Sequence, residues 1–145
     1  MINTKVEYRQ VPGFQGYRVG SDGTLWSRWN RARRLTSIWR QLRSHVAQGV
    51  RSDGRTDRLP YHRVYLYIEG VRHTRLLHRL ILASFVGPCP LGMESRHLNG
   101  DPRDNRLENL IWGTKRHNAQ DKVVHGTHRR FAKLSPSLVR IIRRR

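Results

Sequence analysis

Hydrophobic and polar positions alternate along residues 63–68, where Val64, Leu66 and Ile68 are separated by charged or amphipathic side chains. The pair Glu69-Gly70 follows, and residues 71–76 form a second alternating run. Alternation with a period of two on both sides of a glycine turn predicts a β-hairpin with one apolar face. The other face would carry the arginines of this segment.

Residues 8–27 alternate over shorter runs. Tyr17-Arg18-Val19 and Thr24-Leu25-Trp26 are separated by turn residues that include Asp22-Gly23. This pattern predicts a small twisted antiparallel sheet. Because a small sheet needs large side chains in its core, we expect Trp26 and Trp29 to pack there; stacking of these rings on bases is the alternative.

Helical signals occur in three places. Residues 78–86 are largely apolar and end at Gly87-Pro88, and residues 115–125 lack Gly and Pro and follow Thr114, a favourable N-cap residue. Near the end of the chain, Ser135-Pro136 precedes residues 138–142 and predicts a short helix followed by arginines. Residues 48–60 have few large apolar side chains and predict a loop.

The stretch of residues 94–121 combines turn chemistry with candidate site residues. Residues 95–98 and 107–112 predict two strands, the loop between them begins with Asn, Gly, Asp and Pro, and the helix at 115–125 follows. In such a unit His97 and Asn118 can face each other across a small cleft. Five of the ten acidic residues lie here, namely Glu94, Asp101, Asp104, Glu108 and Asp121. A metal-ion site requires oxygen ligands of this kind.

The chain is strongly cationic, with 29 Lys and Arg residues, 10 acidic residues and a formal charge of +19. These charges are spread over nearly the whole length, so the folded surface should attract a polyanion such as a phosphate backbone. The most basic segment is residues 28–43, for which a solvated cationic loop is the alternative. We expect phosphate contacts from the arginines of this segment, of the hairpin and before His97: Arg28, Arg31, Arg33, Arg34, Arg40, Arg43, Arg63, Arg72, Arg75 and Arg96.

Cys89 is the single cysteine, which excludes an internal disulfide and a zinc site built from several cysteines. No apolar stretch approaches the length of a membrane span, and the first ten residues lack a signal-peptide core. We therefore expect a cytoplasmic protein without a membrane partner.

Three blocks of the sequence resemble parts of one known family. The pattern H-x-N-G-D-x-x-x-N-R-x-x-N-L-x-W-G-T-x-x-x-N over residues 97–118 resembles the HNH motif of phage and intron-associated homing endonucleases. Residues 11–27 are similar to the amino-terminal module that often accompanies this motif, and residues 77–87 are similar to the helix that links the two. The resemblance implies an α+β fold: a small antiparallel β-rich part, a ββα-metal unit and a short carboxy-terminal helix.

The resemblance also implies a role for each motif residue. His97 would be the general base that deprotonates the attacking water, and Asn109 would orient His97 by hydrogen bonding. Asn118 would bind one divalent metal ion, most simply Mg²⁺, with Mn²⁺ or another divalent ion as the alternative. Taken singly, each of these three residues has a purely structural explanation. His78, at the start of an apolar helix, is expected to be structural.

One position departs from the family pattern. Many members place Asp directly before the first His as the other metal ligand, and here that position is Arg96, whose side chain offers no acceptor. Asp121 would be a substitute ligand because it lies three residues from Asn118 on the helix, and Glu94 and His117 are further candidates. Alternatively, His97 itself contacts the metal, or activity is weak.

The resulting hypothesis is a metal-dependent, homing-type DNA endonuclease. Residues 1–90 would form a basic β-rich DNA-binding module with its linker helix, residues 91–128 the nuclease unit, and residues 129–145 a basic carboxy-terminal helix or tail. With one site, a monomer would nick one strand of duplex DNA, and a double-strand break would need a second copy. The alternatives are a catalytically silent DNA-binding protein on the same scaffold and a basic RNA-binding protein of ribosomal type.

Overall fold

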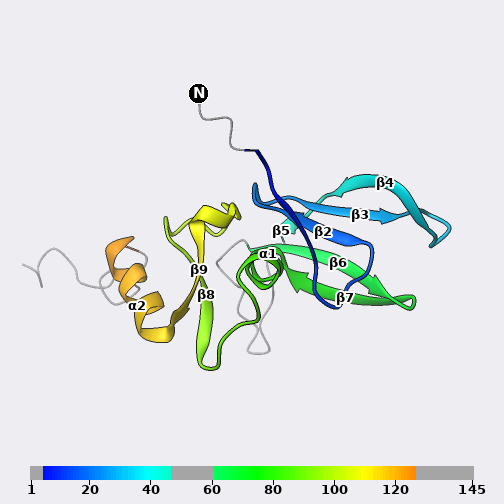
Figure 1. Cartoon of the computed structure of the whole chain (residues 1–145). Coiled ribbons are helices and arrows are strands. Elements are labelled where there is room, and N and C mark those ends of the chain that lie inside the picture. The colour runs from blue at the N-terminus through cyan, green and yellow to red at the C-terminus, as the bar shows by residue number, and fades with distance from the viewer. Residues whose placement is uncertain (1–4, 47–60, 127–145) are drawn as a thin grey trace, which may run out of the picture.

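The computed structural model describes residues 5–46 and 61–126. Within these residues the chain forms a four-stranded and a three-stranded antiparallel sheet, followed by a unit of two paired strands and a helix (Figure 1). A further helix packs between the two sheets and this unit. The predicted α+β class is therefore confirmed. The loop predicted at 48–60 and the helix predicted at 135–145 lie outside the described residues.

The first sheet contains four strands in chain order. They are β1 (Tyr8–Gln10), β2 (Tyr17–Gly20), β3 (Leu25–Trp29) and β4 (Leu35–Leu42). The turn between β2 and β3 is closed by Asp22, whose carboxylate accepts hydrogen bonds from the Thr24 amide at 3.2 Å and the Thr24 hydroxyl at 2.7 Å. The predicted small sheet is confirmed. The basic segment 28–43, for which a solvated loop was the alternative to phosphate contact, consists of the end of β3, a turn, β4 and Arg43.

The two tryptophans of β3 lie on opposite faces of the first sheet. Trp29 packs against the core, as predicted. Its Nε1 donates to the Gln15 carbonyl at 2.8 Å. Trp26 is not in the core, because its position alternates with the buried Leu25 and Ser27. Its ring instead meets Tyr8 edge to face at 6.0 Å.

The predicted hairpin forms the second sheet together with a short third strand. This sheet contains β5 (His45–Val46), β6 (His62–Ile68) and β7 (Val71–Leu76). Glu69 and Gly70 both have positive φ, 49° and 82°, and they connect Ile68 directly to Val71. Two consecutive residues with positive φ are the requirement of a type I′ turn, whose twist matches that of the flanking strands.

The register of the hairpin corrects one expectation about its arginines. Arg75 pairs with Val64, so it lies on the side of the sheet that carries the buried residues, and its guanidinium carbon is 5.5 Å from the centre of the Phe14 ring. Arg72 pairs with Tyr67 on the other side. Arg63, Arg72 and Arg75 therefore do not share one face. The sequence pattern was misleading because β7 lacks a clear apolar alternation.

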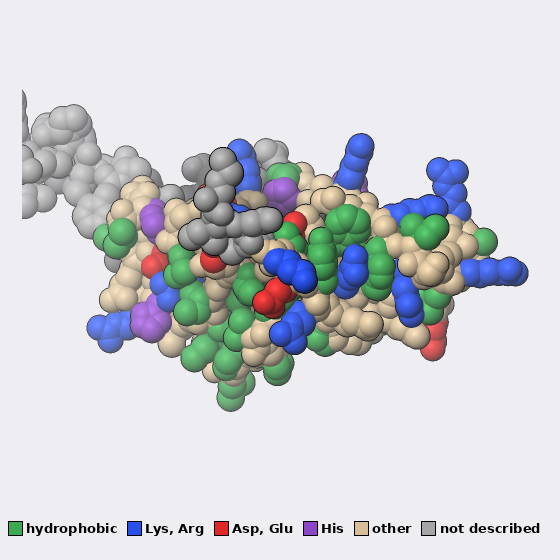
Figure 2. All heavy atoms as spheres, turned by 45° about the horizontal axis from the view of Figure 1, so that its top comes forward, with side chains coloured by type: hydrophobic (Ala, Val, Ile, Leu, Met, Phe, Trp, Pro, Cys, Tyr) green, Lys and Arg blue, Asp and Glu red, His purple; other side chains and the backbone are tan. Residues whose placement is uncertain are grey.

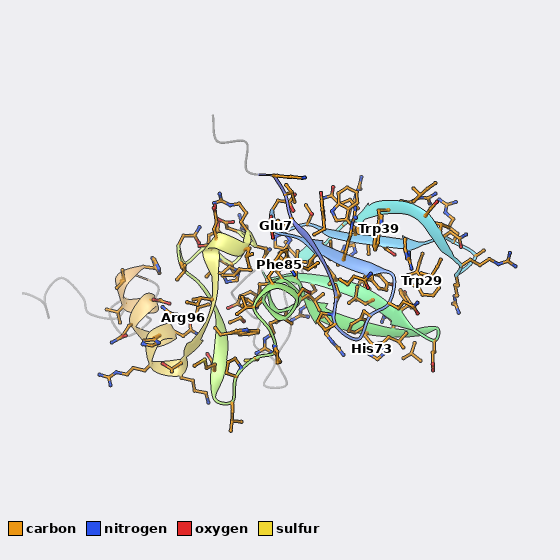
Figure 3. All side chains as sticks on the ribbon, viewed as in Figure 1. Glu7, Trp29, Trp39, His73, Phe85 and Arg96 are labelled. Carbon is orange, nitrogen blue, oxygen red and sulfur yellow. The ribbon has the colours of Figure 1, made fainter. Side chains whose placement is uncertain are left out.

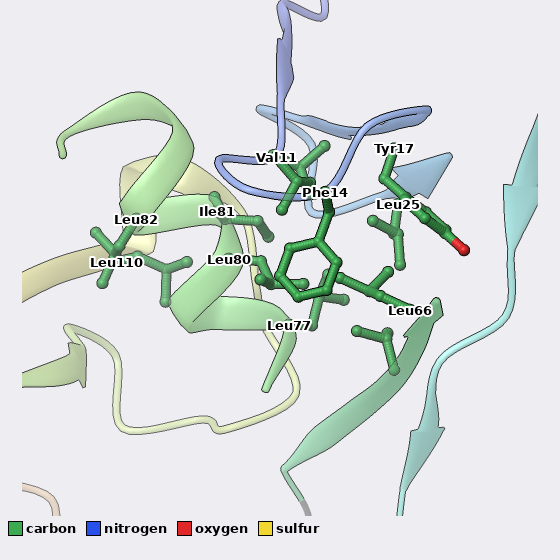
Figure 4. Close-up of a cluster of buried hydrophobic side chains, with 12 residues drawn as sticks. Val11, Phe14, Tyr17, Leu25, Leu66, Leu77, Leu80, Ile81, Leu82 and Leu110 are labelled. Carbon is green, nitrogen blue, oxygen red and sulfur yellow. The ribbon is translucent and has the colours of Figure 1, made fainter. Parts of the chain in front are cut away.

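Helix α1 (Leu77–Phe85) is the element around which the core is built. Its buried side chains Leu77, Leu80, Ile81 and Leu82 belong to one cluster with residues of the first sheet, the hairpin and Leu110 (Figure 4). The helix ends where the amides of Val86 and Gly87 both donate to the Leu82 carbonyl. Because one helix packs on both the β-rich part and the following unit, it fixes their relative placement.

The last described unit contains β8 (Met93–His97), the 3₁₀ turn η1 (Leu107–Asn109), β9 (Leu110–Thr114) and α2 (Lys115–Val124). Strand pairing runs from Met93 with Thr114 to His97 with Leu110. The second strand therefore begins at Leu110 and not at the predicted Leu107. The difference arises because the Leu107 amide donates to the Ser21 carbonyl of the first sheet at 2.9 Å, which holds the chain in a turn. Thr114 caps α2 as predicted, accepting from the His117 amide at 3.3 Å.

Basic side chains project along the whole length of the face drawn in Figure 2, from the β3–β4 hairpin to α2. No helix in the described ranges is long and apolar enough to cross a membrane. The distribution agrees with the expectation that the folded surface itself, and not a tail alone, is cationic.

Candidate active site on the two faces of β8

Strand β8 presents neighbouring residues to different partners. Arg96 lies between β8 and α2 (Figure 3), where it contacts Asp121. His97, the next residue, contacts Tyr61 and His78 instead. Successive side chains of a strand point to opposite faces, so the alternation of β8 separates these two groups. We call the group of Tyr61, His78, His97 and Asn105 the His97 pocket, and the group of Glu94, Arg96, Asn118 and Asp121 the α2 cluster.

The ring of His97 is held on three sides. Its centre lies 6.1 Å from the Tyr61 ring in a stacked arrangement and 5.0 Å from the His78 ring, which crosses it at 71°. Its Nε2 lies 3.3 Å from Oδ1 of Asn105. The amide of Asn105 is itself oriented, because its nitrogen donates to the Arg103 carbonyl at 3.2 Å.

This contact assigns the protonation of the His97 ring. An amide oxygen only accepts hydrogen bonds, so in neutral His97 the proton is on Nε2 and the lone pair is on Nδ1. Burial lowers the pKa of His97 below its usual 6.5, against smaller opposite effects from the Asn105 hydrogen bond and from Asp101 and Asp104. At neutral pH His97 is therefore a neutral imidazole with a basic nitrogen, the form that a general base requires.

Asn109 does not orient His97 directly, which corrects the role implied by the resemblance. Its Oδ1 accepts from the Asn99 amide at 2.9 Å, and its Nδ2 donates to Asn99 Oδ1 at 3.0 Å and to the Asp104 carbonyl at 2.9 Å. Asn109 is buried and satisfies polar groups of the loop that follows His97. Its effect on His97 is therefore indirect, through the loop that carries Asn105.

Asn105 was missed from the sequence because its partner is defined only by the fold. It is buried, and its backbone lies against Gly23 in the turn of the first sheet. A side chain at Gly23 would approach the Asn105 carbonyl carbon to 3.0 Å, and Gly23 has a φ of +88°. The amino-terminal sheet thus supports the loop that places Asn105 beside His97.

An ion-pair network stiffens the outer part of this loop. Arg106 donates to both carboxylate oxygens of Asp104, at 2.9 and 2.7 Å, and to Glu108 at 2.7 Å. The Arg106 hydrogen bonds hold the pKa of Asp104 down, at about 2. Asp104 is therefore ionised at neutral pH and oriented by Arg106.

The α2 cluster contains a two-point ion pair where the family pattern has a metal ligand. Nε and Nη2 of Arg96 donate to the two carboxylate oxygens of Asp121, both at 2.7 Å, and the side chains are only 14% and 23% exposed. The stem of Arg96 packs across Gly113. The guanidinium lowers the pKa of Asp121. In this structure Arg96 is directed at Asp121 and not outward, and each carboxylate oxygen of Asp121 accepts one hydrogen bond from Arg96.

Glu94 and Asn118 form the second contact of the α2 cluster. Nδ2 of Asn118 donates to a carboxylate oxygen of Glu94 at 2.9 Å, and both residues are half-buried. Glu94 lies two residues before Arg96 and hence on the same face of β8. No group of three or more His, Cys, Asp or Glu side chains in the described ranges is arranged to hold a metal ion.

The donor chemistry of this pair nevertheless fits a divalent ion of the magnesium type. Mg²⁺ prefers oxygen ligands and usually takes one or two side chains, completing its shell with water and substrate phosphate. Glu94 supplies a carboxylate, and rotation of the Asn118 amide exchanges its nitrogen for its oxygen. Among the described residues, Glu94 and Asn118 are a pair whose donor atoms could hold the ion.

The arginines expected to contact phosphate differ in exposure. Arg28 and Arg63 are half-buried, and the exposed ones are Arg31, Arg33, Arg34, Arg40, Arg43, Arg72 and Arg75. Arg33, with a φ of 55°, lies in the turn between β3 and β4. The exposed arginines of the β3–β4 hairpin form a basic projection at the end of the molecule remote from α2 (Figures 1 and 2).

Arg18 is a further basic residue that sequence reasoning missed. Its guanidinium carbon lies 4.3 Å from the Tyr8 ring centre and 4.3 Å from the Trp39 ring centre, on the outer face of the first sheet. Cation–π contacts of this kind hold a charge in place without a carboxylate. Its position opposite Trp26 in the β2–β3 register could not be inferred before the strands were aligned.

Most residues of the His97 pocket and the α2 cluster lie in a segment that matches a known family, and Tyr61 and Asp121 lie outside it. Residues 75–120 match the family model described as HNH endonuclease. This match runs from the end of β7 through most of α2 and confirms the predicted HNH relationship.

One individual relative is a phage protein. The chain is 25% identical over 123 residues to DNA endonuclease I-HmuI of Bacillus phage SP01, a match that covers 84% of this chain and 60% of the relative. Its fold is similar to a solved structure of the HNH homing endonuclease I-HmuI, described as showing DNA binding and cleavage, with a TM-score of 0.56, 24% identity and the same coverages. The chain thus spans 60% of the length of this relative.

Proposed function

We propose that this chain is an HNH-type endonuclease that hydrolyses phosphodiester bonds in duplex DNA. The observation that carries the proposal is His97: a neutral imidazole, oriented on three sides, at the end of β8 in the segment that matches HNH endonucleases. I-HmuI, the similar phage protein, is a DNA endonuclease by name. The basic surface would attract the phosphate backbone of a DNA substrate.

In the proposed reaction His97 removes a proton from water through Nδ1. The water oxygen forms a bond to phosphorus as the bond from phosphorus to the 3′ oxygen breaks, so the products carry 5′-phosphate and 3′-hydroxyl ends. Nε2 keeps its proton and its contact with Asn105, which prevents the ring from turning. The 3′ oxygen takes its proton from solvent.

The proposal includes one divalent metal ion, with Mg²⁺ first and Mn²⁺ second, held by Glu94 and Asn118. When bound, the ion would stabilise negative charge on the phosphate and on the leaving oxygen. Asp121 takes a different part, holding Arg96 in place between β8 and α2. Arg96 and Asp121 neutralise each other, so the pair leaves the metal-binding carboxylate to Glu94.

One catalytic unit per chain cleaves one strand. We therefore propose that a monomer nicks duplex DNA, with a second copy required for a break in both strands. Exposed arginines of the β3–β4 hairpin and Arg72 would contact phosphates away from the cut.

The test is the chemistry of the ends. Duplex DNA nicked by the purified chain with Mg²⁺ should be resealed by a DNA ligase without prior treatment, because ligase requires a 5′-phosphate next to a 3′-hydroxyl. Nicks that ligase cannot seal would contradict the proposed reaction. Tighter binding of structured RNA than of duplex DNA, without cleavage of either, would favour the ribosomal-type alternative.

A second function is favoured by the Arg96–Asp121 ion pair. A guanidinium where many relatives have a carboxylate is what a DNA-binding protein with a silent site would retain. Tight binding of duplex DNA without cleavage in Mg²⁺ or Mn²⁺, over many sequences, would support this second function.

A further inference from the structure

His78 is a second histidine at the proposed site, and no role has been assigned to it beyond packing. It occupies the first turn of α1 and is only 3% exposed. Its ring lies 5.0 Å from that of His97 and 5.1 Å from that of Tyr61. Three rings from β8, α1 and the segment before β6 therefore meet in one cluster, in which His78 is buried and Tyr61 and His97 are half-buried.

An imidazole is a costly way to fill this position. Nδ1 of His78 is buried and has no hydrogen-bond partner among the described residues. A buried polar group without a partner destabilises a fold relative to an apolar side chain, because it has given up its hydrogen bonds to water. Burial also lowers the pKa of His78 to about 3, so the ring is neutral across the pH range of interest. Packing alone would be served better by Leu or Phe.

The contact between the His78 ring and the His97 ring indicates a role for His78 beyond packing. Tyr61 covers one face of the imidazole and Asn105 fixes one edge, and these two contacts alone permit tilting about the hydrogen bond. His78 crosses the His97 ring at 71° and blocks this tilt. Edge-to-face contacts of this kind have a preferred geometry, unlike contacts with an aliphatic side chain.

We propose that His78 is a positioning residue that fixes the plane of the His97 ring, so that Nδ1 of His97 is aimed at the attacking water. This inference rests on the proposed function for its effect on cleavage, but the ring contact is a property of the protein without DNA. A ring at position 78 is the requirement, and the nitrogen atoms of His78 are not.

The matched pair of variants is His78→Phe and His78→Leu. Both variants remove the unpartnered nitrogen and fill the position with an apolar side chain, so both should retain or raise the melting temperature. His78→Phe keeps a ring and should cleave at close to the wild-type rate. His78→Leu should lower kcat by roughly 10- to 100-fold with KM unchanged, as expected when a reacting group is misplaced by about 1 Å.

Two further measurements make the outcome specific. Ile81→Val, on the same helix and fully buried, is the control for loss of packing in α1 and should leave kcat unchanged. NMR of the intact protein without DNA should show one orientation of the His97 ring in the wild type and in His78→Phe, through contacts between the rings, and averaged orientations in His78→Leu.

The NMR result separates this inference from the proposed function. If the wild type does not cleave DNA but His97 loses its fixed orientation only in His78→Leu, the proposed nuclease function fails and the positioning role stands. Wild-type kcat and a fixed His97 ring in His78→Leu would overturn the inference. Equal loss of kcat in folded Phe and Leu variants would also overturn it, because the imidazole nitrogens and not the ring contact would then be required.

Discussion

Arg96, the residue directly before His97, is joined to Asp121 by two hydrogen bonds of 2.7 Å between β8 and α2. A planar guanidinium matches a carboxylate in this way, and the low exposure of both side chains protects the pair from solvent. The pair fastens α2 to β8 with protein atoms alone. It also leaves Glu94 as the carboxylate of the α2 cluster that is not bound to an arginine in this structure.

Glu94 and Asn118 should account for metal binding. Calorimetric titration of Mn²⁺ into the DNA-free protein should detect one site, and Glu94→Gln should weaken it at least roughly tenfold, a loss of about 1.4 kcal/mol. Glu108→Gln is the control, because Glu108 pairs with Arg106 and lies outside the α2 cluster. Equal affinities for wild type and Glu94→Gln would reject Glu94 as a ligand.

Replacement of Arg96 by Asp should create a stronger metal site at the expense of stability without metal. In EDTA, Arg96→Asp should melt below the wild type, since like charges would face each other at positions 96 and 121. Saturating Mn²⁺ should then raise its melting temperature by more than that of the wild type, because ligand binding to the folded state stabilises it, by about 2.7 kcal/mol at 100 times Kd.

Arg96→Gln is the matched control, because it breaks the ion pair without adding a carboxylate. Its melting temperature should fall in EDTA and respond to Mn²⁺ no more than the wild type does. Identical Mn²⁺ responses of the Asp and Gln variants would show that position 96 does not face the metal.

The pH dependence of cleavage should reflect the lowered pKa of His97. A general base is active when unprotonated, so kcat/KM should fall as the pH drops through the pKa of His97 in the free protein. Because burial moves this pKa below 6.5, the acid limb should lie below pH 6.5. Cleavage rates measured from pH 4.5 to 8 at constant ionic strength locate the limb. A midpoint above 6.5 would contradict a buried neutral His97.

Exposed arginines of the β3–β4 hairpin should set the salt dependence of DNA binding. Arg33→Ala and Arg34→Ala should each weaken binding at low salt and reduce the slope of log affinity against log salt by about 1. Arg106→Gln is the comparison, because Arg106 is already paired with Asp104 and Glu108 and should leave the slope unchanged. Fluorescence anisotropy of a labelled duplex measures all three. Slopes unaffected in the hairpin variants would place the DNA elsewhere on the surface.

The elements that the sequence predicted well are those with local signals. The hairpin at 62–76 has both alternation and a glycine turn, and α2 has a threonine cap, so neighbouring residues suffice to define them. The start of β9 was misplaced because a hydrogen bond from Leu107 to Ser21, 86 residues away in the chain, decides it.

The candidate site was only partly accessible to sequence reasoning for the same reason. The resemblance pointed to His97, and its spacing from Asn118 followed from the motif. The surroundings of His97 come from three separate segments: Tyr61, His78 and Asn105 meet only when the fold is complete. Asn109 was assigned to His97 by resemblance, and the geometry shows instead that it supports the loop beside it.

The most direct measurement is the conversion of supercoiled plasmid to relaxed circles by the purified protein in Mg²⁺ or Mn²⁺, beside an EDTA control and the His97→Ala variant. The wild type should nick the plasmid, and EDTA should abolish this nicking. His97→Ala should reduce it by roughly 10²- to 10⁴-fold, the usual contribution of a general base, with DNA affinity nearly unchanged. Nicking that survives in His97→Ala, or loss of DNA binding together with cleavage in that variant, would contradict the assignment of His97 as the base.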